Sequence, residues 1–286
     1  MIKRLTSLFA ITTFVIATSG LAFAADMGAP RTPPAPVSVA YDWSGLYVGG
    51  HVGYGWSTTT FSDPSADSVL SCCFTPANPG GASATNATPS AFLGGAHAGW
   101  MYQVARLVVG GDFDWSAMNM KGSGSSVFNV CGLCGAATEA YSINTKWTGT
   151  ATTTIGVARD RLLLYAKAGG AWAENTYGLE AGGTSILFIP PFTITTNSFS
   201  KIVPGWTLGT GVKWAFADNW FVNLEYNYLD FGSKSQNLNG ACTVDAGFPC
   251  VTPAASFNPT FNQHISQIEV GLNYKFNTGP DGFLFW

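Results

Sequence analysis

The sequence predicts an all-β protein, an eight-stranded antiparallel transmembrane β-barrel with long external loops and short periplasmic turns. An export signal opens the chain, and only 10% of the residues are charged although the mean hydropathy is +0.18. Apolar residues alternate with small or polar ones in eight later segments. Soluble domains carry roughly 25% charged residues. A chain with so little charge and no second long apolar run has to distribute its apolar residues over strands, as membrane barrels do.

Residues 1–24 are predicted to be a signal peptide. Lys3 and Arg4 precede an apolar run, and Ala22-Phe23-Ala24 supplies the small residues of a cleavage site. The apolar run is interrupted by threonine and serine, and it is short for a helix that spans a membrane with roughly 20 apolar residues. We therefore expect export through the Sec pathway, with cleavage before Ala25.

Residues 25–42 form a proline-rich segment, which we interpret as an extended periplasmic leader without a core of its own. A plain tail, a spacer and a flap at the barrel mouth are the alternatives for it. Residues 43–286 are assigned to the barrel. Without Lys3 and Arg4, 11 of the 13 basic residues remain against 16 acidic ones, a net charge of −5. No basic stripe is present, so we expect no nucleic-acid partner.

Eight segments show the period of two that is typical of strands. In the last segment, for example, Ile268, Val270 and Leu272 alternate with Glu269 and Asn273. Each segment provides the roughly 9–11 residues that a tilted membrane strand needs. The segments are Trp43–Ser57, Ala91–Val104, Leu107–Met120, Thr145–Ala158, Leu162–Glu174, Phe199–Phe216, Trp220–Phe231 and Gln263–Phe276.

The connections between these segments alternate in length. Tight turns are expected near Ala105, at 159–161 and at 217–219, whereas the other connections are long loops at 58–90, 121–144, 175–197 and 232–262. Short turns at one end and long loops at the other are the pattern of periplasmic turns and external loops. The same orientation places Trp43, Trp100, Trp214 and Trp220 near the periplasmic rim and Trp56, Trp115, Trp147 and Trp172 near the outer rim, as aromatic girdles require.

Four ordered motifs carry a family resemblance. They are YDWSGLYVGG at 41–50, VGGDFDWS at 109–116, AFADNW at 215–220 and VGLNYKF at 270–276. With the leader, they resemble the small outer-membrane β-barrel proteins of alphaproteobacteria, the surface antigen or porin family, which are related to the OmpA-like transmembrane barrels. The resemblance implies roles in envelope integrity and surface antigenicity and, for some members, solute passage or haem binding. It also implies that the barrel-assembly machinery binds an aromatic residue ending the last strand, either Phe276 or Trp286.

Eight charged residues have the parity of the lumen face. A lysine or arginine facing lipid near the membrane midplane costs roughly 2–4 kcal/mol, so these side chains are expected inside, where they can pair. An eight-stranded barrel is only just wide enough for its side chains to fill it, which favours a plugged interior. The glycine-rich inward face of the first segment keeps a narrow conduit as the alternative. The eight residues are Asp112, Asp114, Lys146, Lys167, Lys213, Glu225, Glu269 and Lys275.

His51 and His97 are candidate ligand residues on neighbouring strands. A register that pairs Ser57 with Ala91 would set the two imidazoles opposite one another, with Asp112 or Asp114 beside His97. Imidazole and carboxylate groups together suit several transition metals, and histidine also ligates haem iron. A hydrogen-bonded pair without a ligand is the simpler interpretation, so we predict no metal and no cofactor.

The six cysteines of this exported chain are expected to form disulfides. We predict the local pairs Cys131–Cys134 and Cys242–Cys250, and we expect Cys72 and Cys73 to pair with each other or with another loop. The C-x-x-C spacing at 131–134 lacks the βαβ setting of a thioredoxin-like redox motif.

These patterns together predict an integral protein of the Gram-negative outer membrane with a structural, surface-exposed role. The alternatives are a narrow porin for small solutes, and a surface receptor or adhesin that binds haem or a metal. No catalytic motif is present, so we expect no enzyme. The expected partners are outer-membrane lipid, lipopolysaccharide and the barrel-assembly machinery, which would bind the C-terminal strand. Closure of the sheet removes its edges, so a monomer or a weak oligomer is expected.

Overall fold

The computed structural model describes residues 41–63, 83–129, 136–183, 192–196, 198–244 and 254–276. These residues form a single antiparallel sheet of twelve strands. None of their segments is a helix long and apolar enough to cross a membrane. The predicted signal peptide, the leader up to residue 40 and the segment after Phe276, with Trp286, lie outside the described residues.

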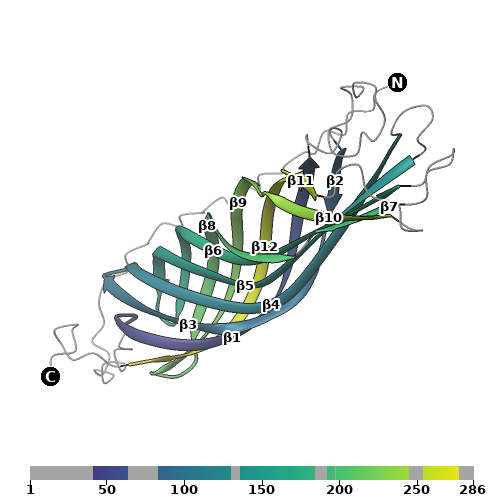
Figure 1. The fold of residues 1–286 in the computed structure, drawn as a ribbon. Coiled ribbons are helices and arrows are strands. Elements are labelled where there is room, and N and C mark those ends of the chain that lie inside the picture. Colours follow the sequence, from purple (N-terminus) through teal and green to yellow (C-terminus); the bar gives the residue numbers. More distant parts are fainter. Residues whose placement is uncertain are drawn as a thin grey trace, which may run out of the picture. The chain divides into compact units, whose positions relative to one another are not determined.

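Eight long strands form a closed ring (Figure 1). Each one pairs antiparallel with two neighbours in the order β1-β3-β4-β5-β6-β8-β9-β12, and β12 returns to β1. The number of strands and their antiparallel pairing agree with the predicted barrel. The eight strands are β1 (Gly45–Asp63), β3 (Ser90–Val104), β4 (Leu107–Asn129), β5 (Ala136–Arg159), β6 (Leu162–Gly183), β8 (Phe199–Ala215), β9 (Trp220–Ser235) and β12 (Thr260–Lys275).

Three short turns mark one end of the ring, here called the turn end. The two-residue turns at 105–106 and 160–161 place Ala105 and Asp160 at positive φ, 55° and 53°. Tight hairpins require this left-handed backbone because it matches the twist of the flanking strands. Residues 216–219 make the third turn, between β8 and β9. The opposite end of the ring is called the loop end.

At the loop end, the strands continue into connections that we expected to be loops. β4 and β5 stay paired from Lys121 opposite Asn144 to Asn129 opposite Ala136. Four short strands also lie there: β2 (Ser83–Ala87), β7 (Phe192–Thr196), β10 (Leu238–Val244) and β11 (Ala254–Phe257). The strands are therefore longer than the predicted segments, because backbone hydrogen bonds extend the ladders through serine-, threonine- and glycine-rich segments, where apolar alternation is weak.

The outer face of the ring is apolar between two aromatic rims. Its side chains include Val52, which is 68% exposed, and Phe92, which is 82% exposed. Such a surface would be unfavourable in water and suits a lipid environment. Trp100, Trp214 and Trp220 are exposed near the turn end, and Trp56, Trp115, Trp172 and Trp206 are exposed nearer the loop end. Trp147, which was predicted at the outer rim, is half-buried in β5. Trp43, which was predicted at the periplasmic rim, is fully buried inside the ring.

Candidate functional site: the barrel interior

The interior of the ring contains three layers. An apolar turn-end cluster comprises Tyr41, Trp43, Tyr47, Met101, Val108, Ala158, Leu163, Tyr165, Ala215 and Phe221. A larger loop-end cluster includes Phe61, Leu93, Met118, Met120, Tyr141, Ile143, Tyr177, Leu229, Phe231, Phe261 and Ile265. Between them lies the polar layer, with His51, His97, Asp112, Asp114, Ser116, Lys167, Lys213, Asn223, Glu225, Asn227, Glu269 and Asn273.

The turn-end cluster is built around Trp43. Its indole Nε1 donates to the carbonyl of Asp160 at 3.2 Å, and its backbone N–H donates to Gln103 Oε1 at 2.8 Å. The ring packs edge-on against Phe221, with centroids 5.6 Å apart. Gly45 follows with φ of +139°, a conformation that side chains rarely adopt, and there the chain begins β1. Tyr41 and Trp43, which precede β1, therefore fill the turn-end mouth.

Tyr41 extends the same cluster outside the strands. Burial raises the pKa of the Tyr41 phenol to about 12, although the Arg161 guanidinium, 5.6 Å from the ring centroid, acts in the opposite direction. The ammonium of Lys275 lies 4.5 Å from the same centroid and donates to the carbonyl of Asp42. These contacts tie the end of the predicted leader, residues 41 and 42, to β12.

The loop-end cluster is largely aromatic. Phe61 stacks on Tyr141 with centroids 5.5 Å apart and meets Phe261 edge-on at 5.3 Å. Tyr177 lies 4.5 Å from Phe261, also between centroids. These rings come from β1, β5, β6 and β12, so the cluster joins strands from different parts of the ring.

The polar layer is held by ion pairs and hydrogen bonds. Lys167 pairs with Glu225, and its Nζ lies 3.9 Å from Asp112 Oδ1. Two tyrosines connect the layer to the turn-end cluster: Tyr47 donates to Asp112 Oδ2 at 2.6 Å, and Tyr165 donates to Glu225. Lys213 Nζ lies 4.4 Å from the Tyr47 ring centroid, a cation–π arrangement.

The structure brings six of the eight predicted charged residues together in the polar layer. They are Asp112, Asp114, Lys167, Lys213, Glu225 and Glu269. Lys275 lies nearer the turn end, against Tyr41. Lys146 does not belong with them: its side chain is 47% exposed and its Nζ lies 3.4 Å from Glu174 Oε1.

A β-bulge is the reason for the different position of Lys146. The β5–β6 register shifts between Thr145 and Trp147, so Lys146 is the extra residue of β5. A bulge breaks the alternation, and the inward positions change from odd numbers before it to even numbers after it. Extrapolating the parity of the segment through Lys146 therefore placed its side chain on the wrong face.

His51, His97 and Asp114 form a compact group within the polar layer. The two imidazole rings are stacked, with centroids 5.4 Å apart and planes within 4°. Asp114 Oδ2 lies 3.2 Å from His51 Nδ1 and 3.6 Å from His97 Nδ1. Asp114 lies beside His97 as its partner on β4, as predicted. The predicted register between β1 and β3 was wrong by two residues, because His97 lies opposite Gly49 and not opposite His51. The long connection after β1 leaves that register undetermined in the sequence.

Several residues of the polar layer were missed from the sequence. Tyr47 and Tyr165 carry the hydrogen bonds to Asp112 and Glu225, and Ser116 and Asn273 contact the two imidazoles. All four have the inward parity of their strands, so a search for polar groups on the inward face, and not for charges alone, would have found them.

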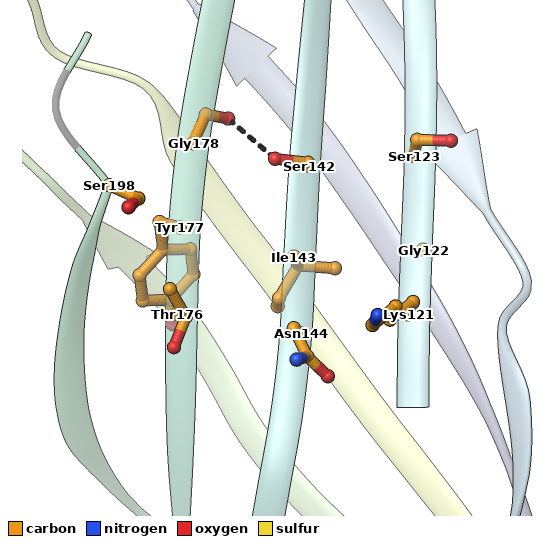
Figure 2. Close-up of a pocket in the computed structure, with 10 residues that line it drawn as sticks. All are labelled: Lys121, Gly122, Ser123, Ser142, Ile143, Asn144, Thr176, Tyr177, Gly178 and Ser198. Atoms are coloured by element: carbon orange, nitrogen blue, oxygen red, sulfur yellow. Dashed lines mark hydrogen bonds between the residues drawn. The ribbon is translucent and has the colours of Figure 1, made fainter. Parts of the chain in front are cut away.

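A separate hollow of about 290 Å³ lies at the loop end (Figure 2). It lies beside the extended parts of β4, β5 and β6 and is lined mainly by serine, threonine, asparagine and glycine, with Lys121 as its one charged residue. Ser142 Oγ donates at 3.4 Å to the carbonyl of Gly178, its partner residue on the neighbouring strand β6. The lining offers hydroxyl groups for polar contacts and no paired carboxylates or nucleophile–base set.

The cysteine predictions concern parts of the chain that are not described. Cys72, Cys73, Cys131, Cys134 and Cys250 lie outside the described residues, and of Cys242 only the backbone, in β10, is described. The disulfides therefore remain predictions.

A closed antiparallel ring with an apolar outer face and a polar layer inside defines a membrane β-barrel. Residues 19–276 match the family model of the outer membrane protein beta-barrel domain, and the chain belongs to that family. The protein is thus an outer-membrane β-barrel protein, as the sequence predicted.

Two similar proteins are named outer-membrane proteins, and the chain aligns with each of them over most of its length. The chain is 28% identical over 265 residues to the 31 kDa outer-membrane immunogenic protein of Brucella melitensis, covering 92% of this chain and 95% of the relative. It is 25% identical over 283 residues to the 25 kDa outer-membrane immunogenic protein of Brucella abortus, covering 96% and 100%.

Solved outer-membrane proteins also align with the structure. OprG from Pseudomonas aeruginosa aligns with a TM-score of 0.44 at 11% identity, covering 84% of this chain and 99% of that one. Ail of Yersinia pestis aligns with a TM-score of 0.33 at 13% identity, covering 82% and 99%.

Proposed function

We propose that this protein is a closed, non-conducting barrel that stabilises the outer membrane and presents its loop end at the cell surface. One observation carries the proposal: two apolar clusters enclose the polar layer, so that a solute would have to pass Trp43 at one end and the Phe61–Tyr141–Phe261 group at the other. For the barrel to open, these tightly packed aromatic side chains would have to leave their places. The loss of their packing would cost several kcal/mol, which opposes spontaneous opening.

The inward glycines support closure as well. They first suggested a vacant path along β1, but neighbouring side chains occupy that space. A Cβ atom at Gly49 would lie 2.7 Å from His97 Nε2, and one at Gly55 would lie 3.1 Å from Met120 Cε. The glycines thus make room for larger inward residues of other strands.

A catalytic role has little support. Ser116 Oγ lies 2.8 Å from His51 Nε2, and His51 in turn lies beside Asp114, an order that resembles a nucleophile–base–carboxylate set. Ser116 is 0% exposed between the two apolar clusters, so a substrate has no access to it. The Ser116 hydroxyl also donates to Asp114 Oδ1 at 3.1 Å, so its proton is already used in a hydrogen bond of the polar layer.

The orientation follows from the connections. Short turns in outer-membrane barrels face the periplasm, so the loop end would face outward, and the relatives' description as immunogenic agrees with surface exposure. The apolar outer face would contact outer-membrane lipid and lipopolysaccharide, and β12, which ends beside the aromatic Phe276, would be the strand that the assembly machinery binds.

Conductance in planar bilayers tests closure. The refolded wild-type protein should stay electrically silent, while heat-modifiable migration in gels shows that it is folded. Phe61→Gly/Phe261→Gly combined with Trp43→Gly should produce discrete current steps, because it removes aromatic rings from both clusters. A matched triple variant on the lipid face, Phe92→Gly/Trp100→Gly/Trp115→Gly, should remain silent. Discrete steps from the wild-type protein would instead establish a narrow porin.

Antibody labelling of intact cells tests the orientation. An epitope tag inserted between β1 and β2 should be labelled without permeabilisation, whereas a tag in the 105–106 turn should be labelled only after it. The opposite result would reverse the proposed orientation.

A further inference from the structure

We propose that the polar layer binds one divalent transition-metal ion, through His51 Nδ1, His97 Nδ1 and Asp114 Oδ2. The three residues come from β1, β3 and β4, and each offers a ligand atom that lies within 4.8 Å of one from each of the other two. The inference goes beyond the role of a closed barrel and does not depend on the orientation or conductance of the protein.

The distances suit a metal ion. Asp114 Oδ2 lies 3.2 Å from one Nδ1 and 3.6 Å from the other. Ligands bound to zinc at roughly 2.0–2.1 Å in a tetrahedron lie about 3.3 Å apart. The Nδ1–Oδ2 separations are therefore close to the edges of a coordination tetrahedron.

Hydrogen bonds determine the tautomer of His97. The amide of Asn273 is oriented by its nitrogen, which donates to Asn223 Oδ1 at 2.7 Å. Its oxygen therefore faces His97 Nε2 and accepts a proton from it. A neutral His97 with its proton on Nε2 carries a lone pair on Nδ1, the atom that faces Asp114.

The same argument holds for His51. Ser116 Oγ donates its one proton to Asp114 Oδ1, so it accepts from His51 Nε2 at 2.8 Å. The Nδ1 atom is left with its lone pair and without a hydrogen-bond partner, although the side chain is 0% exposed. Two lone pairs and a carboxylate oxygen repel one another unless a positive charge lies between them. Ligating histidines typically donate their other N–H to such an acceptor.

The charge of the polar layer also favours a cation. Among the described residues it contains four carboxyl groups, on Asp112, Asp114, Glu225 and Glu269, but only the two ammonium groups of Lys167 and Lys213. Glu269 Oε1 is buried without a hydrogen-bond partner. A divalent ion beside Asp114 would offset this excess of carboxyl groups over ammonium groups, which a buried layer has strong reason to neutralise.

The donor set limits the kind of ion. Two imidazole nitrogens and one carboxylate oxygen suit Zn²⁺, Co²⁺ or Ni²⁺, whereas Ca²⁺ and Mg²⁺ prefer oxygen ligands and Cu⁺ prefers sulfur. The His51 ring is closely packed on the side of β3. A Cβ atom at Gly95 would lie 2.9 Å from His51 Cε1, so one added carbon there would press on this ring.

Metal loading of the wild-type barrel during refolding is the first test, because the two apolar clusters close the polar layer once the protein is folded. The unfolded protein is freed of metal with EDTA, its thiols are alkylated so that cysteines do not contribute, and it is refolded near neutral pH with graded amounts of Co²⁺ or Zn²⁺. We expect one equivalent to bind per chain, with visible absorption bands of Co²⁺ in a nitrogen–oxygen shell and no thiolate charge-transfer band.

Matched variants locate the ion. His97→Gln and Asp114→Asn keep the side-chain size and should each weaken binding by about 100-fold or more. His264→Gln is the control, because His264 is the third histidine and also lies beside a carboxylate, 3.3 Å from Asp230, but on the outward face. It should bind the metal as the wild type does.

Three results would overturn the proposal. The first would be a folded wild-type protein that takes up no Co²⁺ or Zn²⁺, as would occur if both imidazoles were doubly protonated. The second would be binding that persists undiminished in the His51→Gln/His97→Gln double variant. The third would be an X-ray absorption spectrum of the zinc-loaded wild type, which needs no variant to fold, that lacks imidazole scattering or shows sulfur ligands.

Discussion

The two faces of the barrel wall are stabilised in opposite ways, and two lysines illustrate the difference. Lys167 points inward, and its side chain is only 3% exposed. It pairs with Glu225 in the layer between the two apolar clusters. Lys146 points outward at a bulge, is 47% exposed and pairs with Glu174. The inner ion pair is isolated from water and depends on its partner, whereas the outer pair is screened by solvent. The same type of residue therefore has different importance on each face.

The largest expected effect comes from breaking the inner pair. Lys167→Met leaves the buried Glu225 carboxylate without its cation, and it should lower the free energy of unfolding by about 3–5 kcal/mol. Lys146→Met should cost less than about 1 kcal/mol. Urea titration in lipid vesicles, followed by tryptophan fluorescence, measures both. Equal costs would mean that the polar layer is open to water.

The second effect tests the turn-end cluster. Trp43→Ala removes a fully buried indole and its hydrogen bond to the Asp160 carbonyl, and should cost about 3–5 kcal/mol. Trp100→Ala, on the lipid face, leaves no enclosed cavity and should cost less than half as much. If the two variants unfold at the same urea concentration, Trp43 does not close the barrel mouth in solution.

The third effect concerns the lipid face. Val52→Lys places a charge on the outer surface near the middle of β1 and should cost about 2–4 kcal/mol in vesicles. Thr58→Lys, on the same face of the same strand but beyond Trp56, should cost about 0–1 kcal/mol. A cost that is the same at both positions would place the membrane at a different height on the barrel.

The smallest effect is a pH dependence at the turn end. The folded pKa of Tyr41, about 12, exceeds the usual value of 10, so Tyr41 contributes stability below pH 10 that is lost as the pH rises toward 12. Tyr41→Phe cannot ionise, so its unfolding free energy should fall less steeply over that range. Parallel pH profiles for the two proteins would show that Tyr41 is not buried at the mouth.

The sequence predicted the barrel wall better than its contents. Period-two alternation correctly placed the membrane parts of all eight strands, because the parity of a residue such as Val270 is a local property of its strand. Lys146 was misplaced because a bulge reverses parity without a clear sequence signal. Trp43 was misplaced because its alternation continues from β1, although the chain leaves the wall at Gly45.

By itself, the sequence determined that this is an outer-membrane barrel of eight antiparallel strands with an apolar outer face and an inward face that carries charge. Only the tertiary structure decided what those inward residues contact. His51, His97 and Asp114 lie on three different strands, and their grouping depends on registers that closure of the ring imposes. Alternation is repeated within every strand and can be read locally. Register is a relation between strands, and the connection between β1 and β3 is too long to fix it.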